Sequence, residues 1–231
     1  MTTPQLPIVL AITGASGAIY AVRLLETLLA AGRDVYVTVS SSGVAVIEQE
    51  LGVRIALKNL LVDTALNESA LIEASPQVRQ LLLRPNQPAE VHDYSSGQLQ
   101  RGRAYYCHYQ DMMSSIASGS FLTGGMVVAP CSGSTLAAIA CSLGSNLIHR
   151  AAEVHLKERR KLILVPRETP LSLPQIENMR RATEAGAVIL PASPGFYHGA
   201  ESVADLVDFV VGRNCDQLQV GNALIHRWGT E

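Results

Sequence analysis

An arginine and a glutamate, Arg167 and Glu168, follow directly after the apolar run 162–165. In an open sheet of alternating strands and helices, ligands bind beyond the carboxyl ends of the strands, so this pair is placed for chemistry. Arg167 supplies a cation that does not deprotonate, and Glu168 supplies a carboxylate that can move a proton. A basic cluster at 157–161 precedes the same run, and we interpret residues 157–170 as the rim of an active site. The alternative is a solvated loop with ordinary surface charge.

A second candidate is the turn Gly14-Ala15-Ser16-Gly17, which follows the apolar run 7–12. The turn places backbone N–H groups at the start of a helix, where a phosphate or an electron-rich ring edge is favoured. It matches neither the dinucleotide fingerprint nor the Walker loop, so those ligands are disfavoured. A plain tight turn remains the alternative.

Two further turns are rich in hydroxyl groups. One is Ser40-Ser41-Ser42, in which Ser40 could equally be a simple helix cap. The other is Pro130-Cys131-Ser132-Gly133-Ser134-Thr135, in which Gly133 allows the backbone to approach a ligand closely. Two anion-binding turns on one sheet edge suit a mononucleotide such as FMN, with one turn holding the phosphate and the other near the ring.

Charged and aromatic residues in the second half could bind a phosphate. Arg150 and Lys157 share one face of a predicted helix, with Glu153 between them. The alternative is a solvated stripe with a Glu153–Lys157 ion pair. Tyr197 and Arg213 resemble ordinary interface residues until a ligand is proposed.

Short apolar runs alternate with helical patterns along the chain, which predicts an α/β fold with a doubly wound parallel sheet. We expect a single domain over residues 1–231, with an excursion at about 60–110 that is a lid, an oligomer arm or partly disordered. The predicted strands are 7–12, 35–39, 125–129, 161–165 and 187–190. The predicted helices are 18–31, 40–51, 76–83, 134–141, 145–159, 173–185 and 201–213.

The composition excludes several classes of protein. Charged residues make up only 16% of the chain, which predicts homo-oligomer contacts, and a net charge of −2 argues against nucleic-acid binding. The apolar stretch 121–140 is interrupted by turn residues and residues 1–6 lack signal-peptide features, so we expect no membrane span and cytoplasmic residence. The four cysteines form no C-x-x-C pair, so neither a disulfide framework nor a metal site is expected.

Taken together, these motifs resemble the flavin prenyltransferases of the UbiX/Pad type, which were formerly described as aromatic-acid decarboxylases. The resemblance rests on TGASGAIYA near the start and on a long series from Ser118 onward. That series comprises SGS, GGMVVAPCS, RAAEVHLKERR, LVPRETPL, ENM, GAVILPASPGFYH and RWG.

The resemblance implies a flavodoxin-like Rossmann fold, a homododecamer, and reduced FMN at a subunit interface. It implies transfer of a dimethylallyl group from dimethylallyl monophosphate to flavin N5 and C6, with the prenylated FMN delivered to a UbiD-type decarboxylase. The residues implied in FMN binding are Gly14, Ala15, Ser16, Ser40, Ser132, Gly133, Ser134, Thr135 and Arg167. Those implied in prenyl-phosphate binding are Arg150, Lys157, Tyr197 and Arg213, and those implied in catalysis are Ser16, Glu50, Lys157 and Glu168.

Two departures from the resemblance are visible. Met112 stands where some relatives carry a tryptophan, which would replace an aromatic wall by a thioether. The excursion at 60–110 is longer than expected. The competing interpretations are a flavin-dependent decarboxylase of aromatic or cysteinyl acids, with Cys131 or His198 recruited, and a non-catalytic FMN carrier.

Overall fold

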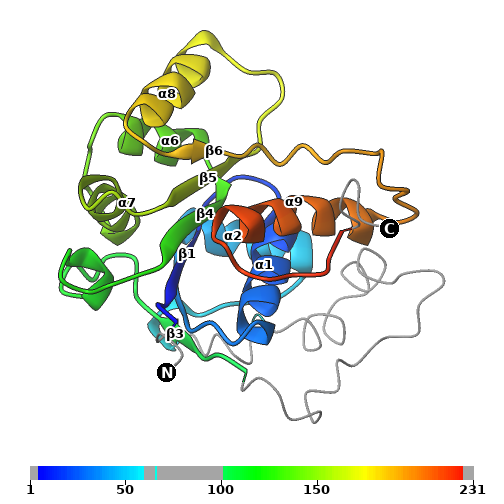
Figure 1. Cartoon of the computed structure of the whole chain (residues 1–231). Helices are drawn as coiled ribbons and strands as arrows, with labels where there is room; N and C mark the ends of the chain where they lie inside the picture. The colour runs from blue at the N-terminus through cyan, green and yellow to red at the C-terminus, as the bar shows by residue number, and fades with distance from the viewer. Residues whose placement is uncertain (1–4, 60–65, 67–100, 226–231) are drawn as a thin grey trace.

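In the part of the chain that is described, six parallel strands form one sheet, and Figure 1 shows helices packed around it. The structure, a computed structural model, describes residues 5–59, 66 and 101–225. The strands lie in the order β3-β2-β1-β4-β5-β6. Their bounds are β1 Ile8–Ile12, β2 Val35–Val39, β3 Ala104–Tyr106, β4 Gly125–Cys131, β5 Leu162–Pro166 and β6 Val188–Ile189.

The order of the strands locates the ligand-binding edge. Without the edge strand β3, the remaining order is that of flavodoxin-like sheets. Chain winding reverses between β1 and β4, which pair in register from Ile8 opposite Gly125 to Ala11 opposite Val128. This reversal is the switch point, and ligands of doubly wound sheets bind there, beyond the carboxyl ends of the strands.

Helices cover both faces of the sheet (Figure 1). One face packs against α1 (Ala18–Ala30), α2 (Ser41–Leu51) and α9 (Val203–Gln217). The other packs against α6 (Gly133–Ala140), α7 (Leu147–Lys157) and α8 (Leu173–Glu184). Every residue of β1, β4 and β5 is buried, as expected for parallel strands covered on both sides. Short 3-10 turns, η1 (Leu57–Asn59) and η3 (Ser115–Ala117), complete the described elements.

The predicted doubly wound α/β fold is confirmed, and five of its strands were predicted close to their observed bounds. Two predictions about elements were wrong. Residues 104–106 belong to the sheet as β3 and not to an excursion from it. The last helix runs on to Gln217, so Arg213 is one turn inside it and not at its end. The predicted helix 76–83 and most of the excursion lie outside the described residues.

Three of the four cysteines, Cys107, Cys131 and Cys215, are buried thiols, and Cys141 is exposed. In the described ranges, none of the helices is long and apolar enough to span a membrane. The same part of the chain contains no group of three or more histidine, cysteine or acidic side chains arranged to hold a metal ion.

Candidate functional site

The ends of the two central strands are tied together by Thr13. Its buried hydroxyl donates to the Pro130 carbonyl at 2.7 Å and accepts from the Ser132 backbone N–H at 2.8 Å. The turns that follow β1 and β4 are therefore held in one fixed relation across the switch point. Sequence reasoning gave Thr13 no role, although a threonine directly after a buried strand was a usable signal.

The first turn, at the start of α1, is closed by a carboxylate. Glu50, from the end of α2, accepts hydrogen bonds from the backbone N–H of Gly17 at 2.9 and 3.1 Å and of Ala18 at 2.9 Å. An acidic group at a helix N-terminus satisfies unpaired donors and is favoured by the helix dipole. We expected these N–H groups to bind the anion of a ligand, but they already bind the Glu50 carboxylate.

The turn at the start of α6 is open. Ser132 caps this helix, because its hydroxyl accepts from the Thr135 N–H at 3.3 Å, and it also contacts the hydroxyls of Ser134 and Thr135. Within the described part of the chain, the backbone N–H groups of Gly133 and Ser134 have no acceptor. Two free donors at a helix N-terminus form an anion-binding site.

The third turn, at the start of α2, is capped and partly covered. The Ser40 hydroxyl accepts from the Gly43 N–H at 3.0 Å, as a helix cap. Gly14 lies so close that a methyl group on it would come within 2.5 Å of the Ser42 Cβ. The turn at 14–17 therefore packs onto the first turn of α2, and only glycine allows this approach.

Arg167 and Glu168 lie where β5 ends, at the same edge as these turns. The Arg167 Nε is buried and has no hydrogen-bond partner among the described residues, which is a costly state for a charged donor. Glu168 is exposed and accepts a long hydrogen bond, 3.4 Å, from the Gln175 amide on α8. Cys131 at the end of β4 pairs with Pro166 at the end of β5. The Arg167 guanidinium and the Glu168 carboxylate therefore follow β5 next to the open turn of α6.

The prediction of a single rim over 157–170 was wrong. Lys157 ends α7 before β5 begins, whereas Glu168 follows the end of β5, so β5 separates them by roughly 17 Å. Lys157 pairs with Glu158, and Arg150 pairs with Glu153 at 3.7 Å and donates to the Ala117 carbonyl at 3.2 Å. The Glu153–Lys157 ion pair of the alternative interpretation does not form, since Glu153 pairs with Arg150 and Lys157 with Glu158. A single chain does not bring Lys157 beside Glu168.

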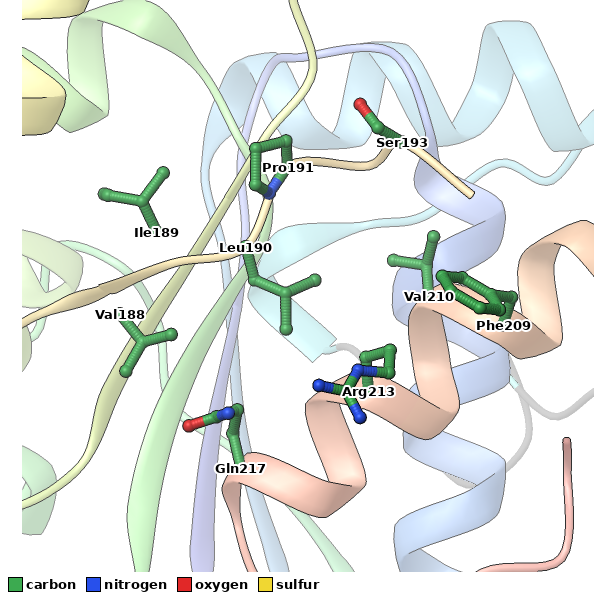
Figure 2. A pocket seen from close by; sticks show the side chains of 9 residues that line it. All are labelled: Val188, Ile189, Leu190, Pro191, Ser193, Phe209, Val210, Arg213 and Gln217. Atoms are coloured by element: carbon green, nitrogen blue, oxygen red, sulfur yellow. The ribbon is translucent and has the colours of Figure 1, made fainter. Parts of the chain in front are cut away.

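Tyr197 packs on Phe209 of α9, and Arg213 follows Phe209 by four residues on the same helix. A pocket of about 250 Å³ lies between β6 and α9. Figure 2 shows the Arg213 guanidinium among the apolar side chains that line it. The Tyr197 ring packs edge-on against Phe209, one turn before Arg213, at 5.7 Å between centroids. His198 stacks on the same ring at 5.1 Å. An aromatic surface formed by Tyr197, His198 and Phe209 therefore lies one helical turn from the Arg213 guanidinium, which pairs with Asp216 at 3.0 Å.

Comparison with known proteins decides the family. The flavoprotein family model matches residues 2–215. The flavin prenyltransferase UbiX of Pseudomonas aeruginosa is 42% identical over 97% of this chain and 94% of its own. The chain belongs to the UbiX flavin prenyltransferase family.

Solved structures agree with this membership in the UbiX family. AnUbiX (PadA1), solved in complex with FMN and dimethylallyl pyrophosphate, is 33% identical, with a TM-score of 0.74 over 98% of this chain and 99% of that one. A dodecameric FMN-dependent UbiX-like decarboxylase from Escherichia coli O157:H7 is 30% identical, with a TM-score of 0.73 over 97% of this chain and 100% of that one. The expected flavodoxin-like fold of the family is confirmed.

Proposed function

We propose that this UbiX family member transfers a dimethylallyl group from dimethylallyl monophosphate to N5 and C6 of reduced FMN. The observation that carries the proposal is the carboxyl edge of the sheet. There the open N–H donors of α6 lie near Arg167, whose buried Nε has no partner among the described residues, and near the accessible Glu168 carboxylate. Its curated relatives are named flavin prenyltransferases, which supports prenyl transfer to a flavin.

The residues at this edge fit FMN. The N–H groups of Gly133 and Ser134, with the hydroxyls around them, would hold the phosphate, because the equivalent donors of α1 are taken by Glu50. Arg167 would give its unpartnered Nε–H to the flavin, and Gly14 to Ser16 together with Ser40 would line the ring. When bound and reduced, FMN supplies the electron-rich ring that accepts the prenyl group.

Four residues would bind the prenyl phosphate: Arg150, Lys157, Tyr197 and Arg213. Cations there would offset the charge that develops on the phosphate as the allylic C–O bond breaks. Because Lys157 lies at the opposite edge of its own sheet, we infer that it serves the site of a neighbouring subunit. The E. coli relative, described as dodecameric, supports an assembly of this kind.

Glu168 is our candidate for proton transfer during ring closure, and Ser16 for a hydrogen bond near flavin N5. Glu50 holds the α1 turn that carries Ser16, so its part in the reaction would be to position that turn. The prenylated FMN would pass to a UbiD-type decarboxylase. Cytoplasmic residence stays a prediction.

Mass spectrometry of the flavin tests the proposal. The purified protein is incubated anaerobically with reduced FMN and dimethylallyl monophosphate, and with the diphosphate in a second arm. A flavin heavier by one C5H8 unit is expected, with inorganic phosphate as coproduct in the first arm. Unmodified flavin in both arms, with FMN still bound, would contradict prenyl transfer.

Decarboxylation, named in the E. coli relative's description, is the second candidate. The version that recruits Cys131 conflicts with the structure, because complete burial raises the pKa of this thiol to about 12 and leaves no thiolate at neutral pH. His198 stacks on Phe209 beside α9, away from the α6 turn. Release of CO2 from an aromatic acid by the FMN-loaded protein alone would support this candidate.

A further inference from the structure

Gln175, in the first turn of α8, makes three polar contacts with its side chain. Its Oε1 accepts from the Ser172 N–H at 2.8 Å and from the Ser172 hydroxyl at 3.0 Å. Its Nε2 donates to Glu168 Oε2 at 3.4 Å. The residue was not singled out from the sequence, although Ser172 and Gln175 have the spacing of a capping box.

The two contacts with Ser172 fix which way the amide faces. A backbone N–H needs an acceptor, so the amide oxygen must point toward Ser172 and the NH2 group must point away from it. That NH2 group faces Glu168 and the start of α6, since a methyl group on Gly133 would lie 3.2 Å from Gln175 Nε2. Because Gly133 has no side chain, the Gln175 amide has room to contact Glu168 while it lies against the first turn of α6.

Burial supports a specific role for this side chain. Gln175 is half-buried, whereas every other residue of 171–176 is exposed, including the large apolar Leu173 at 70%. α8 packs against α6 next to it. Among residues 171–176, it is therefore the polar side chain of Gln175 that points toward the site.

We propose that Gln175 is a positioning residue that holds the Glu168 carboxylate beside the α6 turn. The inference rests on the proposed function, in which Glu168 moves a proton during prenyl transfer. The amide N–H donor keeps the carboxylate in one orientation, and Ser172 keeps the amide in place. At 3.4 Å this hydrogen bond is weak, so its contribution is to orientation.

Two variants isolate the N–H donor. Gln175→Glu keeps the oxygen that caps Ser172 but adds charge, and Gln175→Ala adds no charge but loses the cap. Only the loss of the amide donor is common to both. We expect kcat to fall about five- to tenfold in both, while the KM for the prenyl donor and the Kd of the alanine variant for FMN change less than threefold.

Thermal unfolding and a flavin-free structure complete the test. Gln175→Glu should keep the wild-type Tm, and its crystal structure should show the Glu168 side chain turned away from residue 175 with α8 unchanged. Wild-type kcat in Gln175→Ala, or Glu168 unmoved in Gln175→Glu, would overturn the inference. FMN affinity falling in parallel with kcat in both variants would also overturn it, in favour of a binding role. Absence of product from the wild type would contradict the proposed function itself, and the structural readout would still test the positioning.

Discussion

The turns that begin α1 and α6 flank the same crevice, yet they differ in what their N–H groups bind. At α1, Glu50 accepts from Gly17 and Ala18. At α6, only the Ser132 hydroxyl acts as a cap, and the N–H groups of the next two residues stay open in the described structure. One turn is neutralised from within the chain, and the other is left for a ligand.

The difference shows that a glycine- and serine-rich turn is not by itself a phosphate site. Both turns have small residues and a helix dipole, so local sequence predicts the same ligand at each. The two turns differ because the carboxylate of Glu50, 33 residues after Gly17 in the chain, binds the donors of the α1 turn alone. The α1 turn is then suited to the uncharged ring and the α6 turn to the phosphate.

The largest effect should come from a residue on neither turn. Glu168→Gln keeps the shape of the side chain and leaves both turns intact, but it removes the group that we assign to proton transfer. Product formation should fall at least about 100-fold while FMN binds with unchanged Kd. Single-turnover mass spectrometry and flavin fluorescence titration measure the two quantities. Undiminished turnover would remove Glu168 from the mechanism.

Closing the α6 turn in the manner of α1 should weaken FMN binding. Ser132→Asp keeps a good helix cap but places a carboxylate at the open donors. We expect the Kd for FMN to rise roughly 10- to 100-fold, with the Kd for riboflavin, which lacks the phosphate, changed much less.

Ser40→Asp is the matched control, because Ser40 caps α2 in the same way. Its effect on the ratio of riboflavin to FMN affinity should be clearly smaller. A larger effect at Ser40 than at Ser132 would move the phosphate to α2.

Opening the α1 turn should cost stability and create an anion site. Glu50→Ala leaves the Gly17 and Ala18 N–H groups without their acceptor, which should lower the free energy of unfolding by about 0.5–2 kcal/mol. Added inorganic phosphate should then raise the Tm of the variant more than that of the wild type, by scanning calorimetry. Equal responses would show that Glu50 does not block an anion at this turn.

The smallest expected effect is a pH dependence of stability caused by His155, and it limits the pH range in which the variants of the two turns can be compared. Burial lowers the pKa of His155, behind β4, to about 4, and its ring bonds to Thr123 at 2.8 Å. The unfolded chain takes up this proton near pH 6.5 and the folded protein does not, so stability falls as pH drops from there toward 4. Between pH 7 and 6 the free energy of unfolding should fall by an amount on the order of 1 kcal/mol or less, measured by urea denaturation. His155→Gln should lose this dependence, and an unchanged slope would exclude His155 as its source.

Much of the fold follows from local patterns. The runs at 7–12 and 35–39 are typical of buried strands, and the helices after them have apolar residues at helical spacing. A turn of small or hydroxyl-bearing residues lies between each run and its helix. The strand 104–106 was missed because three residues, Ala-Tyr-Tyr, carry too little periodicity to be seen after a long polar stretch.

The site was predictable as an edge but not as a set of contacts. The closure of α1 by Glu50 and the direction of the Gln175 amide depend on tertiary packing between separate helices. The position of Lys157, in contrast, followed from topology: a residue just before a parallel strand lies at the edge opposite the residue after it. The prediction of a rim over 157–170 gave more weight to the closeness of the charged residues in the sequence than to this topological rule.

A crystal structure of the protein with FMN bound would show which of the two turns holds the phosphate. We expect phosphate oxygens within hydrogen-bond distance of the Gly133 and Ser134 N–H groups, and Glu50 still bound to Gly17 and Ala18. A phosphate bound to the α1 turn, with Glu50 displaced, would contradict this expectation.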